Sequence, residues 1–343
     1  MPIVTIGIDL AKNVFAVHGV DESGKAALIK PRVSRDKLSE LIAQLPPCLI
    51  GMEACSGAHH WARVFQQYGH TVRLMAAKLV APYRMSGKRG KNDAADAAAI
   101  CEAVGRPNMR FVPLKDEHQQ ATLCLHRTRQ GFVEERTATY NRIRGLLAEF
   151  GVVLPTSPRR LRRDIALHLD VLPGWARRCI TDLLDHAGNI EVRLAEYDCA
   201  VGEIAQTDER SKRLLQLRGI GPTTASALLA SLGAGHDFQN GRQVAGWLGL
   251  TPGQHSSGGK TRLGSITKAG DAYLRSLLVL GARSVIAHLG EKQDRFSRWA
   301  RSLVDRRGYW YWRAAVAIAA KNARLAWAAL KFGEEFKLEP AAA

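Results

Sequence analysis

Four acidic residues occupy positions from which their carboxylates can act together. Asp9 and Glu53 each close a short apolar run with strand character, and Asp93 and Asp96 lie three residues apart in an alanine-rich helical stretch. Side chains three apart share a helix face. If that helix packs across the sheet, the four carboxylates converge, and such a cluster requires cations among its charges. Hard oxygen ligands suit Mg²⁺, and two such ions can clamp the attacking and leaving oxygens of a phosphodiester.

Each of these acids also has an ordinary explanation when it is taken alone. An aspartate at a strand end is usually a turn residue, and Glu53 could cap the following helix. Asp93 and Asp96, in a first helical turn, would complement the helix dipole. Only the joint arrangement, two strand ends together with a D-x-x-D helix, favours a catalytic metal site.

A second group of reactive residues lies in a Gly/Ser-rich stretch over 251–264 without regular periodicity. Ser257 or Ser256 could attack phosphorus and keep the energy of a broken DNA bond in a phosphoserine link, provided that the hydroxyl is activated. His255 is a possible base, and Lys260 and Arg262 could hold phosphates. By itself, Ser-Ser-Gly-Gly is a flexible linker in most proteins.

The stretch 217–225 resembles a helix-hairpin-helix, in which a glycine turn presents backbone N–H groups to a DNA phosphate. Gly219 and Gly221 are then candidates for phosphate contact. A plain turn between two helices, with the glycines used for capping and close packing, explains the stretch equally well.

The elements that must position these residues fall into three regions. Alternating apolar runs predict strands at 3–10, 14–20, 26–33, 49–53 and 71–75, with helices at 35–45, 58–68 and 93–104, the last capped by Asn92. Three adjacent strands followed by helix–strand–helix–strand indicate a mixed sheet with helices packed on it. Long charged helices at 117–150 and about 160–204 predict a coiled-coil-like arm. A basic cluster lies near the bend of this arm, and we interpret it as a solvated face. It consists of Arg159, Arg160, Arg162 and Arg163. Mainly helical sequence follows from 210 to 331.

We therefore expect an α/β domain at 1–112, an all-α connector at 113–208, a mainly helical domain at 209–335, and a disordered tail at 336–343. The net charge of +17 over 343 residues favours a polyanionic partner. A membrane-surface protein is less consistent, because the basic residues do not gather on one amphipathic segment, and Lys321 and Arg324 interrupt the longest late apolar stretch. Six scattered cysteines and the lack of a signal peptide predict a cytoplasmic protein.

Several motifs together resemble those of a known family. The N-terminal ones look like the DEDD signature of a bacterial insertion-sequence transposase family that includes the pilin-gene invertases. The C-terminal ones stand in the same order as in that family's transposase domain. They are 6–12, 52–57 and 91–97, then 217–225, Gly249-Leu250-Thr251-Pro252, Ser257-Gly258, Lys268-Ala269-Gly270 and Leu274-Arg275.

The resemblance, which covers about 3–110 and 213–285, implies more than the residues show. It implies an RNase H-like, RuvC-type first domain, Asp9, Glu53, Asp93 and Asp96 as the Mg²⁺ ligands, and Ser257 as the nucleophile. It further implies a structured bridge RNA that pairs with donor and target DNA, and tetramers whose active sites join two protomers. If base pairing with the RNA selects the DNA sequence, the protein needs mainly contacts with the phosphates and the shape of the nucleic acid. Candidates for these are Arg84, Lys88, Arg89, Lys91, Gly219, Gly221, Lys260, Arg262 and Lys268.

Three other functions compete with this interpretation. A RuvC-type structure-selective nuclease or resolvase would use the same acids with water as the nucleophile. A non-catalytic protein could hold DNA or RNA through its hairpin and arm. A kinase-like ATPase is the weakest alternative, because the sequence has no second Gly-rich phosphate loop with matching strands.

Overall fold

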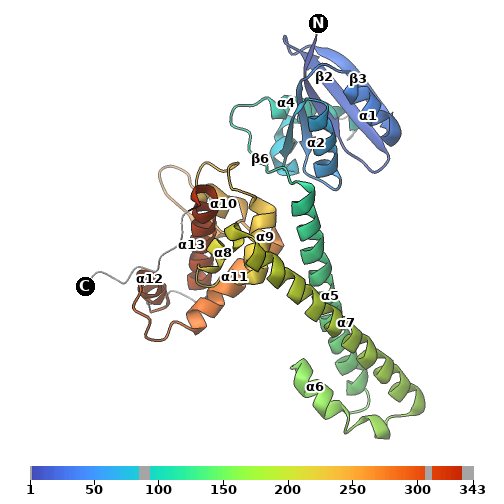
Figure 1. Ribbon diagram of the computed structural model, residues 1–343, viewed down its shortest axis with the longest axis vertical. Helices are drawn as coiled ribbons and strands as arrows, with labels where there is room; N and C mark the ends of the chain where they lie inside the picture. The colour runs from blue at the N-terminus through green and yellow to red at the C-terminus, as the bar shows by residue number, and fades with distance from the viewer. Residues whose placement is uncertain (1, 85–92, 306–310, 334–343) are drawn as a thin grey trace. The chain divides into compact units, whose positions relative to one another are not determined.

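The computed structural model describes residues 2–84, 93–305 and 311–333. The chain divides into two compact units, Met1–His118 and Gln119–Ala343 (Figure 1). Each unit has its own hydrophobic core. The N-terminal unit is a sheet with helices, and the C-terminal unit is helical apart from one small hairpin. Both parts agree with the predicted α/β and all-α organisation.

A six-stranded mixed sheet forms the N-terminal unit, in the order β3-β2-β1-β4-β5-β6. The first three strands pair antiparallel, β1 with β4 and β4 with β5 pair parallel, and β6 is antiparallel to β5. The predicted strands and helices all form, whereas two-residue β6 was not expected. The elements are β1 (Ile3–Asp9), β2 (Val14–Asp21), β3 (Ala26–Ser34), α1 (Arg35–Ala43), β4 (Leu49–Glu53), α2 (Ala58–Gln67), β5 (Thr71–Met75), α3 (Ala77–Val80), the 3₁₀ turn η1 (Ala81–Tyr83), α4 (Asp93–Val104) and β6 (Phe111–Val112).

Alternation along β1 and β4 separates the two faces of this sheet. Ile6 and Ile8 of β1 are completely buried in a core that also contains residues of α1 and α2. Since successive side chains of a strand point to opposite faces, Gly7 and Asp9 lie on the other face. The same holds for Gly51 and Glu53 of β4, because β1 and β4 pair in parallel with Gly7 opposite Gly51.

Helix α4 covers that second face at unusually close range. A Cβ on Gly7 would lie 2.2 Å from the carbonyl oxygen of Ala97 and 2.3 Å from the amide nitrogen of Cys101, both in α4. A Cβ on Gly51 would lie 2.7 Å from the Cβ of Val104. Both strands therefore need a glycine two residues before their terminal acid, since any side chain there would displace the helix.

In the C-terminal unit, two long antiparallel helices form the predicted arm. They are α5 (Glu117–Ala148) and α7 (Gly174–Thr207), with α6 (Pro158–Ile165) and the 3₁₀ turn η2 (Leu169–Val171) in the connection. The Phe132 and Tyr197 rings meet edge to face, and the Tyr140 hydroxyl donates to Glu191 at 2.8 Å. All four arginines of the predicted basic cluster are exposed. Arg162 pairs with Glu191 and Arg163 with Asp164, each at 2.7 Å.

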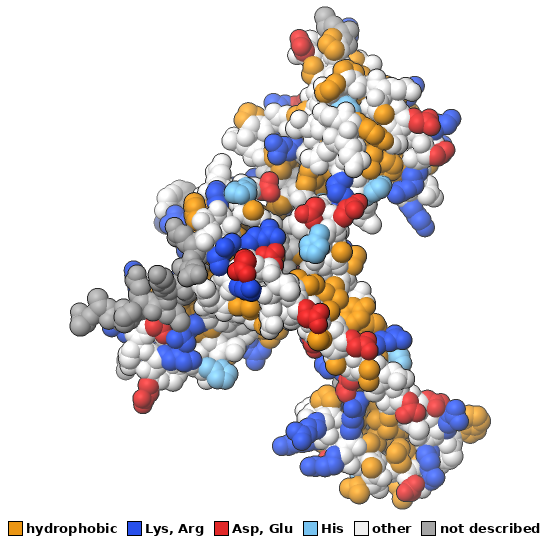
Figure 2. Space-filling view, in the orientation of Figure 1, with side chains coloured by type: hydrophobic (Ala, Val, Ile, Leu, Met, Phe, Trp, Pro, Cys, Tyr) orange, Lys and Arg blue, Asp and Glu red, His pale blue; other side chains and the backbone are white. Residues whose placement is uncertain are grey.

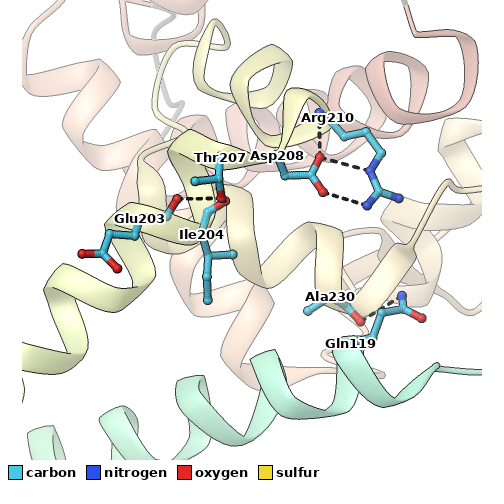
Figure 3. Close-up of polar contacts among 7 residues, drawn as sticks. All are labelled: Gln119, Glu203, Ile204, Thr207, Asp208, Arg210 and Ala230. Atoms are coloured by element: carbon cyan, nitrogen blue, oxygen red, sulfur yellow. Dashed lines mark hydrogen bonds and ion pairs between the residues drawn. The ribbon is translucent and has the colours of Figure 1, made fainter.

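A polar junction joins the arm to the helices that follow (Figure 3). The Thr207 hydroxyl donates to the Glu203 carbonyl at 2.9 Å in the last turn of α7. Asp208 then caps α8 (Glu209–Leu215), accepting from the Arg210 amide at 2.8 Å and pairing with its guanidinium. Near the start of α5, the Gln119 amide group donates to the Ala230 carbonyl at 3.3 Å.

Helix α9 (Pro222–Leu232) lies inside the helical core and is buried over its last nine residues. It contacts α7, α8, α11 (Ala272–Ala287) and α13 (Tyr311–Phe332), whereas α10 (Gly241–Trp247) and α12 (Arg295–Val304) pack on α13. The hairpin β7 (Pro252–Gln254) and β8 (Leu263–Ile266) follows α10 and precedes α11 in the chain. The expected tail at 336–343 lies outside the described residues. Among the helices of the described ranges, none has the length and hydrophobicity needed to span a membrane.

Candidate functional site

The four predicted acids come from three elements of the N-terminal unit. Asp9 and Glu53 end the neighbouring parallel strands β1 and β4, and both are half-buried. Asp93 and Asp96 stand in the first turn of α4, the helix that lies on the same sheet face, with Asp96 only 6% exposed and Asp93 exposed. The close approach permitted by Gly7 and Gly51 is therefore what brings the helix acids to the strand acids.

The charges of the other three acids act on Asp9. The pKa of Asp9 is raised to about 6, first because its carboxyl is buried and then because of repulsion from Asp96, Asp93 and Glu53 in that order. Arg84 acts in the opposite direction and lowers it. A carboxyl whose ionised form is this disfavoured marks a site that gains from an added positive charge.

One basic side chain already lies among the acids. Arg84, which directly follows η1, places its Nε atom 2.7 Å from Asp96 Oδ1 and its Nη2 atom 3.1 Å from Glu53 Oε1. The Nε atom is buried and makes no hydrogen bond of acceptable geometry in the described structure, so its contact with Asp96 is an ion pair only. Arg84 is also one of the predicted contacts for nucleic-acid backbones, and in the structure it lies against two of the site's carboxylates.

The carboxylates suit a divalent cation by their chemistry, since all four offer hard oxygen atoms and Arg84 offsets their mutual repulsion at Asp9 only in part. Within the described ranges, however, no three potential ligands lie close enough together to hold one ion between them. Arg84 takes up an oxygen of Glu53 and one of Asp96 in this arrangement. The four carboxylates thus fit a metal by their chemistry. In the structure, however, two of them pair with Arg84.

The predicted serine stretch folds into a β-hairpin and not into an irregular loop. His255 pairs with Arg262 through a 2.9 Å backbone hydrogen bond, and Ser257 pairs with Lys260 through one of 3.0 Å. The two residues between Ser257 and Lys260, Gly258 and Gly259, have φ values of 55° and 76°. Positive φ at both central positions is what a tight two-residue hairpin turn requires, which explains the glycine pair.

The register of this hairpin decides which side chains share a face. Directly opposite residues and residues two apart lie on the same side, so Ser257, Lys260, His255 and Arg262 form one face. Ser256 lies on the other face, where its hydroxyl accepts from the Gln254 side chain at 2.8 Å and from the Arg262 amide at 3.3 Å. The Ser257 hydroxyl, in contrast, has no hydrogen-bond partner within the described structure and is exposed between basic neighbours.

The base of the hairpin is held rigidly by the other motif residues. A Cβ on Gly249 would lie 2.3 Å from the Ala269 nitrogen, and one on Gly270 would lie 1.9 Å from the Trp247 carbonyl oxygen. Arg275 of α11 donates to the Ala269 carbonyl at 3.0 Å. Between these fixed points, Lys268 adopts a φ of 52°, the one positive value among the described non-glycine residues. Its exposed side chain is thus presented from a conformation that favours glycine.

Helices α8 and α9 form the helix–turn–helix predicted around Gly219, but the two glycines serve differently. Gly219 has a φ of 82°, and a Cβ there would lie 2.6 Å from the Gly281 carbonyl oxygen of α11. Close packing therefore explains Gly219. Gly221 precedes α9 with open space where a Cβ would stand, so it is the glycine available to a phosphate.

Of the other residues predicted to contact nucleic acid, three are described by the structure and three are not. Lys260, Arg262 and Lys268 are exposed on or beside the β7–β8 hairpin. Lys88, Arg89 and Lys91 lie outside the described residues, as does the expected cap Asn92. Lys and Arg side chains occur on both units in the view of Figure 2, interspersed with acids, so this face has no single basic segment.

Comparison with known proteins gives matches over both regions. A family model described as a transposase of the DEDD type matches residues 6–151, and one described as "Transposase IS116/IS110/IS902 family" matches residues 211–298. A probable family 20 transposase of Pseudomonas aeruginosa is 45% identical, covering 96% of this chain and 97% of its own length. The transposases for IS1328 of Yersinia enterocolitica and IS1111A of Coxiella burnetii are each 38% identical, covering 98% and 97% of this chain and 99% and 91% of their own lengths.

Proposed function

Since the chain belongs to the IS110/IS116 family of DEDD transposases, which cut and rejoin DNA, we propose that it does so through a covalent link between Ser257 and DNA. The observation that carries the proposal is that Asp9, Glu53, Asp93 and Asp96 come from two strand ends and one helix on the same sheet face. Burial, and then repulsion from the other three acids, raises the pKa of Asp9 to about 6. The strand order, three antiparallel strands followed by two parallel ones, supports an RNase H-like core.

The acids would hold the divalent cation, and the family's DEDD signature suggests one. When bound, Mg²⁺ would neutralise the clustered carboxylates and polarise the scissile phosphate. The guanidinium of Arg84 must move away before Glu53 Oε1 and Asp96 Oδ1, the oxygens that it contacts, can become ligands. Once released, the same side chain is free to pair with a DNA or RNA phosphate, which reconciles its position with its predicted role.

Ser257 supplies the nucleophile in this mechanism. Its Oγ attacks phosphorus and loses its proton, for which His255 on the same hairpin face is a candidate acceptor. The bond from phosphorus to the 3′ oxygen breaks, and that oxygen leaves as a 3′-hydroxyl after taking a proton. The 3′-hydroxyl of the exchanged strand then attacks the phosphoserine, and Ser257 regains its proton. Lys260 and Arg262 on the same face would hold the phosphate in place.

Matched serine variants test this assignment. Wild-type protein, Ser257→Ala and Ser256→Ala are incubated with labelled DNA, its guide RNA and Mg²⁺, and the products are separated by denaturing electrophoresis. We expect the adduct of protein and DNA to disappear with Ser257→Ala and to persist with Ser256→Ala. Adduct at wild-type yield from Ser257→Ala would refute the assignment, and cleavage by wild type without any adduct would favour the water-using nuclease.

The acids need a separate test, because loss of the adduct could also follow from loss of DNA binding. Asp96→Asn and Asp9→Ala should abolish strand cleavage and leave binding of nucleic acid largely intact. Cleavage by Asp9→Ala protein at the wild-type rate would contradict a role for the cluster.

A bridge RNA and a tetramer complete the proposal. The net charge of +17 supports polyanionic partners, and the acids and Ser257 belong to different units of the chain, which is compatible with active sites shared between protomers. Mixing Asp96→Asn with Ser257→Ala protein tests the sharing, since composite sites would restore cleavage that neither variant performs. A structured noncoding segment beside the gene, with loops complementary to the element's ends and target, would support the RNA.

A further inference from the structure

Two aromatic side chains are exposed at the start of helix α13, most of which is buried or half-buried. Tyr311 is 41% exposed and Trp312 is 56% exposed, whereas the helix contributes Ala314, Ala315 and Ile318 to the core. Aromatic rings bury large apolar areas in folding, so an exposed pair represents surface that this fold leaves uncovered.

The Trp312 ring is held in place by its neighbours. The Arg283 guanidinium carbon, from α11, lies 5.1 Å from the Trp312 ring centroid, a cation–π distance. The Tyr311 ring meets Trp312 at an interplanar angle of 85° with the centroids 5.6 Å apart. One turn before Arg283 on α11, Leu280 is a further exposed apolar side chain, at 52%. These contacts favour the ring orientation that the structure shows.

The charges of this patch are positive and uncompensated. Arg283 and the neighbouring Arg313 are both exposed, and neither forms an ion pair with an acid of the described ranges. A second copy of this chain would bring its own net charge of +17 toward these arginines. A partner that offers both flat apolar rings and negative charge is better matched.

The geometry points to a platform for unpaired nucleotides, formed by Tyr311, Trp312, Arg283 and Arg313. A nucleobase released from pairing would stack on the Trp312 ring, and its phosphate would pair with a guanidinium. Duplex DNA cannot use the ring in this way because its bases are already stacked and paired. The platform goes beyond the proposed strand transfer, since it needs no metal and no Ser257.

Binding of short labelled oligonucleotides tests the platform, with Trp175→Ala as the matched control. Trp175 is a still more exposed tryptophan, at 83%, on α7. Anisotropy of uridine and thymidine oligonucleotides, and of a DNA duplex, is measured at fixed salt in EDTA. We expect Trp312→Ala to weaken binding of single strands about tenfold and binding of the duplex less than about twofold, with Trp312→Phe largely restoring affinity. Trp175→Ala should resemble wild type.

Each outcome bears on the platform independently of the strand-transfer chemistry. An equal loss of single-strand and duplex binding in Trp312→Ala, no loss at all, or the same loss in Trp175→Ala would overturn the inference. A loss restricted to the uridine or the thymidine oligonucleotide would support it and identify the strand as RNA or DNA. Adduct formation by Trp312→Ala on nicked duplex DNA reports separately on Ser257, so failure of one proposal is distinguishable from failure of the other.

Discussion

The substitution Gly7→Ala tests how the sheet and α4 bring the acids together. The new methyl group would stand 2.2 Å from the Ala97 carbonyl oxygen and 2.3 Å from the Cys101 nitrogen. Both are backbone atoms of α4, so no side chain can rotate away and the whole helix must shift. Overpacking that side chains can absorb costs about 1–3 kcal/mol, and a collision with backbone belongs at the upper end, about 3 kcal/mol.

Alanine substitutions at two other glycines serve as comparisons for the expected loss of stability in Gly7→Ala. At Gly51 the colliding atoms belong to the Val104 side chain, at 2.7 Å, so Gly51→Ala should cost less than Gly7→Ala. Gly131, inside α5, has open space around its Cβ position. Gly131→Ala should therefore stabilise the protein by about 0.5–1 kcal/mol through the better helix propensity of alanine.

Scanning calorimetry of the full chain, with hydrogen exchange of peptides from β1 and α4, measures the effect. We expect the transition of the N-terminal unit to fall by about 10 °C in Gly7→Ala, with faster exchange in α4, and to be unchanged in Gly131→Ala. Mn²⁺ binding should weaken as well, because a displaced α4 moves Asp93 and Asp96 from Asp9. A Gly7→Ala protein that melts and binds Mn²⁺ like wild type would refute the packing argument.

Three further predictions concern charge and strain. Arg84→Gln should tighten Mn²⁺ binding by about tenfold in calorimetric titration, because Glu53 and Asp96 lose a competing cation; weaker binding would contradict this. Lys268→Gly should keep or raise the melting temperature, because φ is 52° there, and weaken DNA binding in gel shifts; unchanged binding would exclude a contact. His126 is fully buried with its pKa lowered to about 4 by burial and then by Arg129. The neutral form is therefore the native one, so about 3 kcal/mol of stability present above pH 6.5 should be lost as the pH falls toward 4. Urea unfolding of His126→Gln should lack that slope, and an identical slope would show that other groups cause it.

The physical reason for the His126 prediction is a network inside the C-terminal unit. One ring nitrogen of His126 in α5 lies 3.0 Å from the Ser226 hydroxyl of α9, and the other lies 3.1 Å from the Tyr273 hydroxyl of α11. Because Ser226 already donates to the Pro222 carbonyl at 3.0 Å, its oxygen accepts from the imidazole. A protonated ring would be a donor at both nitrogens, so the Tyr273 hydroxyl could no longer donate to it and would have to accept from it instead.

Much of the N-terminal unit was predictable from sequence because its signals are local. Alternation and apolar runs located β1 to β5, and Asp93–Val104 was predicted with the observed bounds of α4. The acids at strand ends followed from the same pattern. The arginine among them did not, because Arg84 is 31 residues from Glu53 and nothing in the local sequence records such a pairing. The signal available in retrospect is the glycine two residues before each strand acid, which marks where a helix must approach.

The serine region shows the opposite case, in which local sequence misleads. Strands β7 and β8 have three and four residues, mostly exposed, so no hydrophobic alternation distinguishes them from a linker. Their pairing is set by Gly258 and Gly259 at the turn and by contacts with α10 and α11 at the base. The two adjacent serines looked equivalent in sequence, but the register places them on opposite faces.

The two halves of the proposed chemistry are therefore held in different ways, and substitutions should affect them differently. The acids depend on a packed helix–sheet contact, so changes remote from the carboxylates, such as those at Gly7 and Gly51, reach them through displacement of α4. Ser257 stands at the exposed end of a hairpin whose base, at Gly249 and Gly270, is tightly packed. Substitutions at the base should therefore misplace the nucleophile, whereas those at the tip should act only through the face shared with Lys260 and Arg262.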